Sequence, residues 1–230
     1  MRNSTLASAI ALSMLAGVAQ AQTLFFSEGF EGTPAAGWSS NLIVNDSERP
    51  AFSRFGGRYT NDVVSLTLNA FTPRDSVDGP GDGPGNDNTQ ITYDLSFDLY
   101  VIDTWDGAAS SFGPDTLRVQ LDGATIFEET FANQHTNQSF REPDVGREAL
   151  GFQTAGNDSI YRDIDLRFTL PSDQQTFTIA WQGLGLQARQ DESWGIDNVF
   201  LTAMAIPTPG TMGLLALGSG LALRRRRAAA

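Results

Sequence analysis

The sequence of 230 residues predicts an all-β domain between residues 22 and 205, built as a sandwich of two antiparallel sheets. Three observations predict it. Apolar and polar residues alternate with a period of two over several long stretches, as half-buried strands require. Gly, Pro and Asp residues separate these stretches. No stretch in this range repeats apolar residues at the helical period of 3.6. Together the three patterns are typical of an antiparallel jelly roll.

The longest alternation runs through QITYDLSFDLYVID, from Gln90 to Asp103. We expect its apolar set to face the core: Ile91, Tyr93, Leu95, Phe97, Leu99 and Val101. The segment DTLRVQLDGATIFEETF predicts a hairpin that turns at Asp122-Gly123. Four other segments predict strands, namely DVVSLTLNAF, DIDLRFTLP, QTFTIAWQG and GIDNVFLTAMAI. Residues 74–88 are Pro, Gly, Asp and Asn almost throughout and predict a surface loop, and residues 133–158 predict a second long loop.

Residues 1–21 have the features of a secretory signal peptide. Arg2 precedes an apolar run over residues 6–18, and Ala19-Gln20-Ala21 follows as a small-residue cleavage site. A run of about 13 residues at roughly 1.5 Å each is too short to cross a bilayer core of about 30 Å. We therefore expect this segment to be removed from a secreted protein.

The last 25 residues, 206–230, combine three parts in a fixed order. A proline motif, IPTPG, precedes a short apolar segment over residues 211–223, and four arginines follow it. Arginines resist translocation and would stay on the cytoplasmic side of the inner membrane. The residues that carry this sorting pattern are Pro207, Thr208, Pro209, Gly210, Arg224, Arg225, Arg226 and Arg227.

This order of parts resembles the PEP-CTERM sorting signal of Gram-negative-type bacteria. The resemblance implies that the secretion machinery exports the chain and that the tail helix anchors it transiently in the inner membrane. An exosortase-type transpeptidase would then remove the tail and pass the protein to the cell surface or extracellular matrix. Thr208 stands where the usual motif has Glu, which leaves the cleavage point open.

Charge and cysteine content narrow the function classes. All 27 acidic residues lie between the two terminal segments, whereas five of the 15 basic residues, all arginines, lie within those segments. The domain therefore carries 27 acidic groups against 10 arginines, a net charge near −17, which repels nucleic acid and anionic lipid. Its many carboxylates either solvate the surface or bind a hard cation such as Ca²⁺. Without cysteine there is no disulfide and no thiolate site.

Two short segments, FSEGFEGTPAAGW and SWGIDNVFL, bracket the domain, and we expect them to lie on adjacent strands. They resemble the frame of carbohydrate-binding modules and MAM-type domains, which implies a concanavalin A-like or galactose-binding-like jelly roll. In the carbohydrate-binding relatives a glutamate and a final aspartate meet at a structural calcium. The resemblance therefore implies Glu31 and Asp197 as Ca²⁺ ligands; alternatively, both are solvated edge residues.

A second candidate site lies in FDLYVIDTWDGAASSFGPDTLRVQLDG, a segment that resembles one in secreted bacterial jelly-roll proteins with the same tail. Asp103, Asp106 and Asp115 flank one loop and could converge on a cation. Trp105 lies between two of them, where an exposed indole could stack on a sugar. The alternative is a core tryptophan beside acidic turn residues.

The sequence offers little support for catalysis. Its single histidine, His135, cannot build a common zinc site, and no G-x-S-x-G elbow accompanies it. The strand-borne carboxylate motif of laminarinase-type glycosidases is also absent. The sequence therefore predicts a non-catalytic binding or structural module, with extracellular polysaccharide as its expected ligand. The alternative is a carbohydrate-active enzyme that uses only Asp and Glu.

Overall fold

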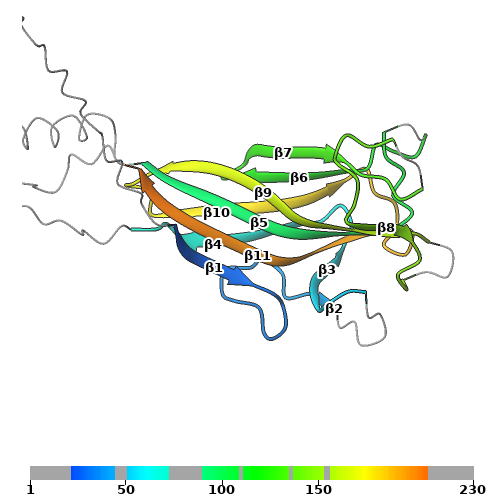
Figure 1. Cartoon of the computed structure of the whole chain (residues 1–230), viewed down its shortest axis with the longest axis horizontal. Coiled ribbons are helices and arrows are strands. Elements are labelled where there is room, and N and C mark those ends of the chain that lie inside the picture. The colour runs from blue at the N-terminus through cyan, green and yellow to red at the C-terminus, as the bar shows by residue number, and fades with distance from the viewer. Residues whose placement is uncertain are drawn as a thin grey trace, which may run out of the picture.

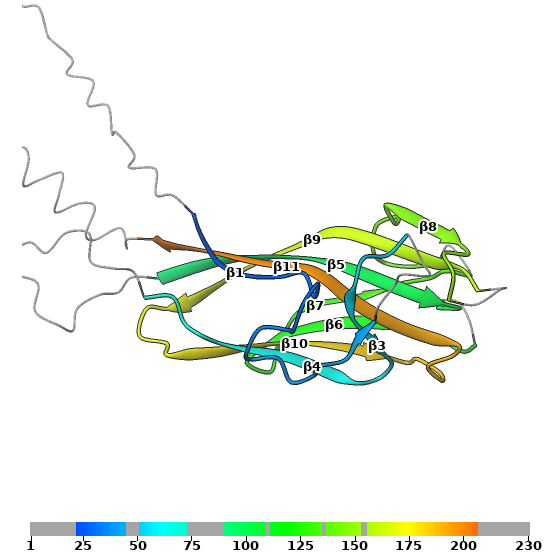
Figure 2. The same ribbon diagram turned by 90° about the horizontal axis from the view of Figure 1, so that it is seen from below.

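The computed structural model describes residues 22–44, 51–72, 90–108, 111–134, 137–152 and 156–206. These residues form strands and loops without any helix, and the strands make two antiparallel sheets. Figure 2 shows the sheets as two layers along the length of the domain. The prediction of an all-β sandwich of two antiparallel sheets is thus confirmed.

The larger sheet is built around three long antiparallel strands, in the order β9, β5, β11 (Figure 1). Two short strands share the outer edge of β11, with β1 paired to its second half and β3 to its first half. The first and last strands are therefore neighbours, as predicted. The sheet contains β1 (Thr23–Glu28), β2 (Ile43–Val44), β3 (Phe55–Tyr59), β5 (Gln90–Asp103), β8 (Val145–Glu148), β9 (Asp158–Pro171) and β11 (Glu192–Ile206).

The smaller sheet has the strand order β4, β10, β6, β7. It contains β4 (Val63–Asn69), β6 (Thr116–Leu121), β7 (Ala124–Thr130) and β10 (Thr176–Leu184). The predicted hairpin joins β6 and β7, and Leu121 pairs with Ala124 across its two-residue turn. Asp122 and Gly123 both have positive φ, of 48° and 85°, which this kind of hairpin turn requires.

The main core lies between the two sheets. All six residues of the predicted apolar set of β5 belong to it, and each is at most 1 % exposed. Trp181 of β10 and Leu66 of β4 are fully buried in the same core from the opposite sheet. Burying a large apolar side chain contributes roughly 1.5–3 kcal/mol relative to leaving it exposed. This core is therefore the main source of stability in a chain without disulfides.

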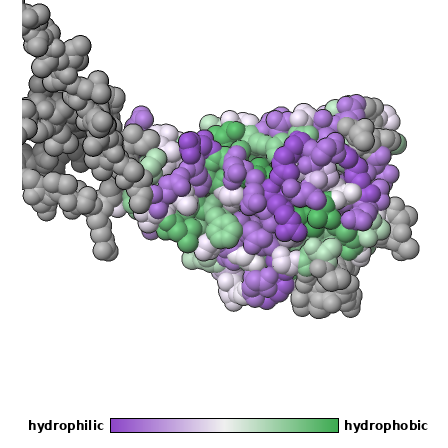
Figure 3. Space-filling model, viewed as in Figure 1, coloured by the Kyte–Doolittle hydropathy of each residue, from purple (hydrophilic) through white to green (hydrophobic). Residues whose placement is uncertain are grey.

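A second, smaller cluster covers part of the other face of the larger sheet. Tyr100 and Ile102 alternate with the core residues of β5 and point away from the main core. Phe52, Phe55 and Ile160 pack against them. Figure 3 shows one face of the molecule, on which hydrophilic residues separate several hydrophobic patches.

The predicted loop over residues 133–158 is wrong in part. It contains β8, which pairs with β9, and β9 itself begins at Asp158. A first strand beside the last one was predicted without bounds, whereas β2 and β3 were not predicted, because their short sequences show no sustained alternation. Gly56 and Gly57 interrupt the alternation of apolar and polar residues in the sequence of β3, and β2 has only two residues.

Several predictions fall outside the described residues. They concern the signal peptide, the loop over residues 74–88, His135, and the sorting residues Pro207 to Gly210 and Arg224 to Arg227. Within the described ranges, the chain forms no helix with the length and apolar character needed to cross a membrane.

Candidate metal site at one end of the sandwich

Three acidic residues meet at the end of the sandwich where β5 ends and β6 and β11 begin. Asp106 follows β5 and Asp115 directly precedes β6, so the loop between them passes from one sheet to the other. Glu192 is the first residue of β11 and pairs with Asp103, the last residue of β5. We refer to Asp106, Asp115 and Glu192 as the acidic trio.

The carboxylates of the acidic trio are close enough to share a cation. One ligand oxygen from each residue lies within 4.8 Å of the others. Asp115 and Glu192 are both 0 % exposed, and Asp106 is half-buried. Carboxylates this close repel one another unless a proton or a cation lies between them.

Each of the two buried carboxylates is only half satisfied by hydrogen bonds. Asp115 Oδ2 accepts a bond from the backbone N–H of Asp106 at 2.5 Å, and Glu192 Oε2 accepts one from Gln187 N–H at 2.6 Å. Their other oxygens, Asp115 Oδ1 and Glu192 Oε1, are buried and accept no hydrogen bond from any described residue. Because an unsatisfied buried oxygen is costly, these two atoms are suited to bind a cation or a proton.

Burial raises the pKa of Asp115 to about 7 and that of Glu192 to about 8. Burial is the largest cause, and the negative charges of neighbouring carboxylates, with Asp106 and Asp191 acting on each residue, contribute to the same shift. The backbone N–H bonds described above oppose this shift only in part. At neutral pH the raised pKa values therefore favour a proton or a bound cation at Asp115 and Glu192.

The structure brings together two of the three aspartates predicted for this loop, Asp106 and Asp115. Asp103 is not part of the cluster. Its Oδ2 is bonded instead to the guanidinium of Arg58, which also donates to Ser193 Oγ at 2.7 Å. The backbone N–H of Asp103 donates to Asp158 Oδ1 at 2.9 Å. Asp103 therefore has a cation from the chain itself.

Glu192 completes the trio, and sequence reasoning missed it. It directly precedes the segment SWGIDNVFL, but nothing local distinguishes it from Asp191. Only the pairing of β11 with β5 places it beside Asp106 and Asp115. The useful signal was the position of an acidic residue at the start of the strand next to β5.

The prediction of an exposed Trp105 is wrong, and the alternative of a core tryptophan is correct. Its side chain is 0 % exposed and its Nε1–H donates to the carbonyl of Ser193 at 2.9 Å. Phe131 packs edge-on against it, with ring centroids 6.2 Å apart. Trp194 is also fully buried, and its Nε1–H donates to Thr60 O at 2.6 Å. Neither indole offers a face to a sugar.

The pairing of Glu31 with Asp197 at a calcium ion stays a prediction. Asp197 is 1 % exposed; Ser53 Oγ and Tyr100 Oη donate to its Oδ2, the latter at 3.0 Å. Burial raises its pKa. Glu31 is exposed in the loop after β1, where its backbone carbonyl accepts a bond from Arg54. Asp197 is therefore already bonded to two hydroxyls, in contrast to Asp115 and Glu192.

Comparisons with known proteins assign no family. No family model matches the chain, and no curated protein matches it. One similar solved structure is the crystal structure of dimeric latent PorU from Porphyromonas gingivalis, with a TM-score of 0.39 and 11 % identity. The match covers 83 % of this chain and 14 % of that one. A similarity at this level supports no functional inference.

Proposed function

We propose that this chain is a secreted β-sandwich module, sorted to the cell surface or extracellular matrix, that binds Ca²⁺ at the acidic trio. Its role is non-catalytic, as a binding or structural protein with extracellular polysaccharide as the expected ligand. The observation that carries the proposal is the pair of buried, unpartnered oxygens, Asp115 Oδ1 and Glu192 Oε1, within one acidic cluster.

Calcium suits the chemistry of this cluster. Ca²⁺ takes six to eight oxygen ligands at roughly 2.3–2.6 Å, and carboxylates, backbone carbonyls and waters all serve. The trio offers three carboxylates and contains no nitrogen or sulfur ligand that would favour zinc. A cation here would also join the larger sheet, through Asp106 and Glu192, to the smaller sheet through Asp115. For a secreted domain without disulfides, such a link would add stability.

The proposed destination depends on the terminal segments of the sequence. The signal peptide over residues 1–21 and the tail over residues 206–230 flank the domain of residues 22–205. We expect the tail to hold the exported chain at the inner membrane until an exosortase-type transpeptidase removes it. Deleting residues 211–230 should release the protein into the medium. Tail-bearing protein retained in the cytoplasm would contradict this sorting.

The finer description of the fold as a jelly roll of concanavalin A-like or galactose-binding-like type belongs to the same proposal. The adjacency of β1 and β11 supports it, because a jelly roll commonly places its first and last strands side by side.

A non-catalytic role agrees with the burial of the trio. Asp115 and Glu192 have raised pKa values of the kind that general acids need. However, both side chains are 0 % exposed, so a glycosidic oxygen could not come within hydrogen-bonding distance of either one. The same burial is compatible with a small cation.

Thermal unfolding of the mature secreted protein, with millimolar Ca²⁺ or with chelator, tests the calcium site. A bound ion stabilises by about 2.7 kcal/mol at a hundredfold excess over its Kd. For a domain of this size that raises the midpoint by roughly 5–10 °C. We call this calcium-dependent rise in the unfolding midpoint the calcium increment. Glu192→Gln should abolish it, because the substitution removes a charged ligand.

Glu31→Gln is the matched control, because Glu31 belongs to the other predicted calcium site. We expect this variant to keep the calcium increment. If Glu31→Gln instead loses the increment while Glu192→Gln keeps it, calcium binds at the terminal pair with Asp197. An unchanged midpoint in the wild-type protein would refute calcium binding at either site.

A further inference from the structure

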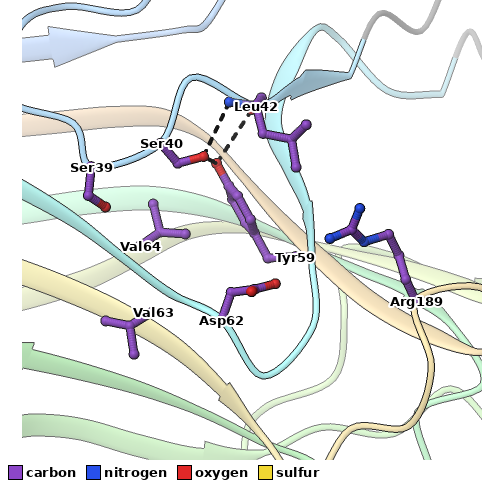
Figure 4. Close-up of a pocket in the computed structure, with 8 residues that line it drawn as sticks. All are labelled: Ser39, Ser40, Leu42, Tyr59, Asp62, Val63, Val64 and Arg189. Carbon is purple, nitrogen blue, oxygen red and sulfur yellow. Dashed lines mark hydrogen bonds between the residues drawn. The ribbon is translucent and has the colours of Figure 1, made fainter.

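A small polar pocket lies next to the loop that joins β10 to β11. Its volume is about 190 Å³. Its walls come from the segment before β2, from β3, from the turn into β4 and from Arg189 in the β10–β11 loop. Figure 4 shows Tyr59 in the middle of these residues, with the guanidinium of Arg189 directed toward it. Pockets for drug-sized ligands are roughly 300–1,000 Å³, so this one suits a single small unit.

The charged groups of the pocket have unused hydrogen-bonding capacity. Arg189 extends an exposed guanidinium that has no hydrogen bond or ion pair with any described residue. Asp62 accepts bonds from the backbone N–H of Thr60, at 3.1 Å, and from its hydroxyl, both through Oδ2. Its Oδ1 has no partner among the described residues. The pocket thus offers one donor group and one acceptor group of opposite charge.

Hydroxyl groups line the opposite part of the pocket. The single O–H of Tyr59 is shared between Ser40 Oγ and Leu42 O, each 3.4 Å away (Figure 4). Bonds of this length are weak, so both hydroxyls can exchange them for a ligand. Ser39 Oγ accepts a shorter bond of 2.8 Å from Ser65 N–H and keeps its own proton available.

Exposed apolar side chains complete the pocket. Leu42 and Val63 are 42 % and 54 % exposed. They are two of the five large hydrophobic side chains that are exposed in the described parts of the chain, and both line this pocket. Apolar surface beside a few convergent polar groups is the usual composition of a small-ligand site.

We propose that this pocket binds one neutral sugar unit of a polysaccharide. Sugar hydroxyls both donate and accept, so one sugar can bond to Asp62, to Arg189 and to the hydroxyls together. The C–H groups of the ring would lie against Leu42 and Val63. A neutral ligand fits best, because Asp62 and Arg189 cancel within the pocket and the domain charge near −17 repels anions.

The loop that carries Arg189 is held at several points, which fixes its position for binding. Arg58 donates to the carbonyl of Arg189 at 2.7 Å, and Asp191 N–H donates to Ala188 O at 2.7 Å. Gln187 N–H is bonded to Glu192 of the acidic trio. The pocket is therefore built on the same end of the sandwich as the trio, and these bonds hold the loop that carries Arg189 in place.

This inference deepens the proposed binding role and rests on it. The test measures binding of the mature secreted protein to neutral glucan, mannan and galactan, and to a uronate polymer, by affinity electrophoresis and calorimetry. Arg189→Ala and Asp62→Asn should each weaken binding to a neutral polymer at least tenfold. Arg162→Ala is the matched control, because Arg162 is an exposed arginine on β9, outside the pocket. It should bind like the wild type, and thermal midpoints verify that all three variants fold.

Each other result has a distinct meaning. Wild-type binding that neither pocket substitution weakens would place the sugar elsewhere, refuting the pocket while keeping the proposed binding role. Binding of the uronate polymer alone, lost in Arg189→Ala, would refute the neutral ligand. Silence of the wild type on all four polymers would overturn both the pocket and polysaccharide binding, whereas the calcium increment is measured separately.

Discussion

Two sets of buried carboxylates lie at the same end of this sandwich, and they are compensated in different ways. The first, which we call the arginine network, contains Arg58, Asp103 and Asp158. The second is the acidic trio of Asp106, Asp115 and Glu192. Asp103 and Asp158 are both 0 % exposed, as are Asp115 and Glu192. These four fully buried carboxylates therefore differ in their partners and not in the depth of their burial.

The arginine network is completed by the chain itself. Arg58 bonds Asp103, while Asp158 accepts N–H bonds from Asp103 at 2.9 Å and from Leu150 at 3.0 Å. The acidic trio has backbone donors but no guanidinium within the described residues. The number of acidic residues in a cluster therefore does not by itself identify a cation site. What identifies it is a buried carboxylate that has no internal cation and keeps one oxygen without a hydrogen bond.

Among these variants, we expect the largest loss of stability from removing Arg58. Arg58→Met keeps a flexible apolar stem but leaves Asp103 buried without its cation. Breaking a buried pair in this way costs about 3–5 kcal/mol. The midpoint of thermal unfolding should fall by roughly 10 °C, at about 2–4 °C per kcal/mol for this size.

The control for that experiment is Arg118→Met, which removes an exposed ion pair with Glu128 on the β6–β7 hairpin. We expect little change in its midpoint, because exposed pairs contribute little. Equal midpoints for the two variants would mean that Arg58 does not stabilise the network.

The next largest effect should come from Trp105, which lies in the chain between Asp103 and Asp106. Trp105→Phe removes the hydrogen bond to Ser193 O and leaves a gap beside Phe131. We expect a loss of about 2 kcal/mol in unfolding free energy, measured by urea denaturation. Polysaccharide binding should not change, because the indole is fully buried.

Trp38→Phe provides a comparison, because the Trp38 indole N–H donates to no described acceptor. It should destabilise less than Trp105→Phe. A Trp105→Phe protein with wild-type stability and weaker sugar binding would restore the interpretation of Trp105 as a ligand-binding residue.

The parts of the fold that could be predicted are those that local sequence determines. The six apolar residues of β5 alternate without interruption, so their burial followed from the period alone. The β6–β7 turn followed from Asp122-Gly123 for a similar reason. In contrast, β3 and β8 become strands only through pairing with β11 and β9, which lie far away in the sequence.

The candidate site also combines residues that local sequence predicts with residues that only long-range strand pairing places. Asp106 and Asp115 flank one loop, so their convergence was predictable from spacing. Asp103 belongs to the arginine network because Arg58 reaches it from β3, a strand that the sequence did not predict. Glu192 joins the trio through the register between β5 and β11. Long-range pairing therefore removed one predicted ligand and supplied another.

The smallest expected effect, and the one most specific to the trio, is a change in how the free energy of unfolding depends on pH. The pKa values of Asp115, about 7, and Glu192, about 8, lie above the ordinary value of roughly 4 for an unfolded carboxyl group. The folded protein thus retains protons that the unfolded chain has lost. Without calcium, the stability that these two protonated carboxyl groups contribute is fully present below about pH 4 and is lost as the pH rises toward 8.

Calcium should flatten this slope, because a bound cation replaces the protons on the trio. Burial also raises the pKa of Asp158 and of Asp197, which adds a slope of the same sign. Their contribution should not respond to calcium, since both carboxylates are already bonded within the chain. Unfolding midpoints measured between pH 5 and pH 8, with calcium or with chelator, therefore separate the contribution of the trio from that of Asp158 and Asp197. In chelator, Glu192→Gln should reduce the slope of the unfolding midpoint against pH, and calcium should no longer change that slope. If calcium does not change the slope in the wild-type protein, the trio binds no cation.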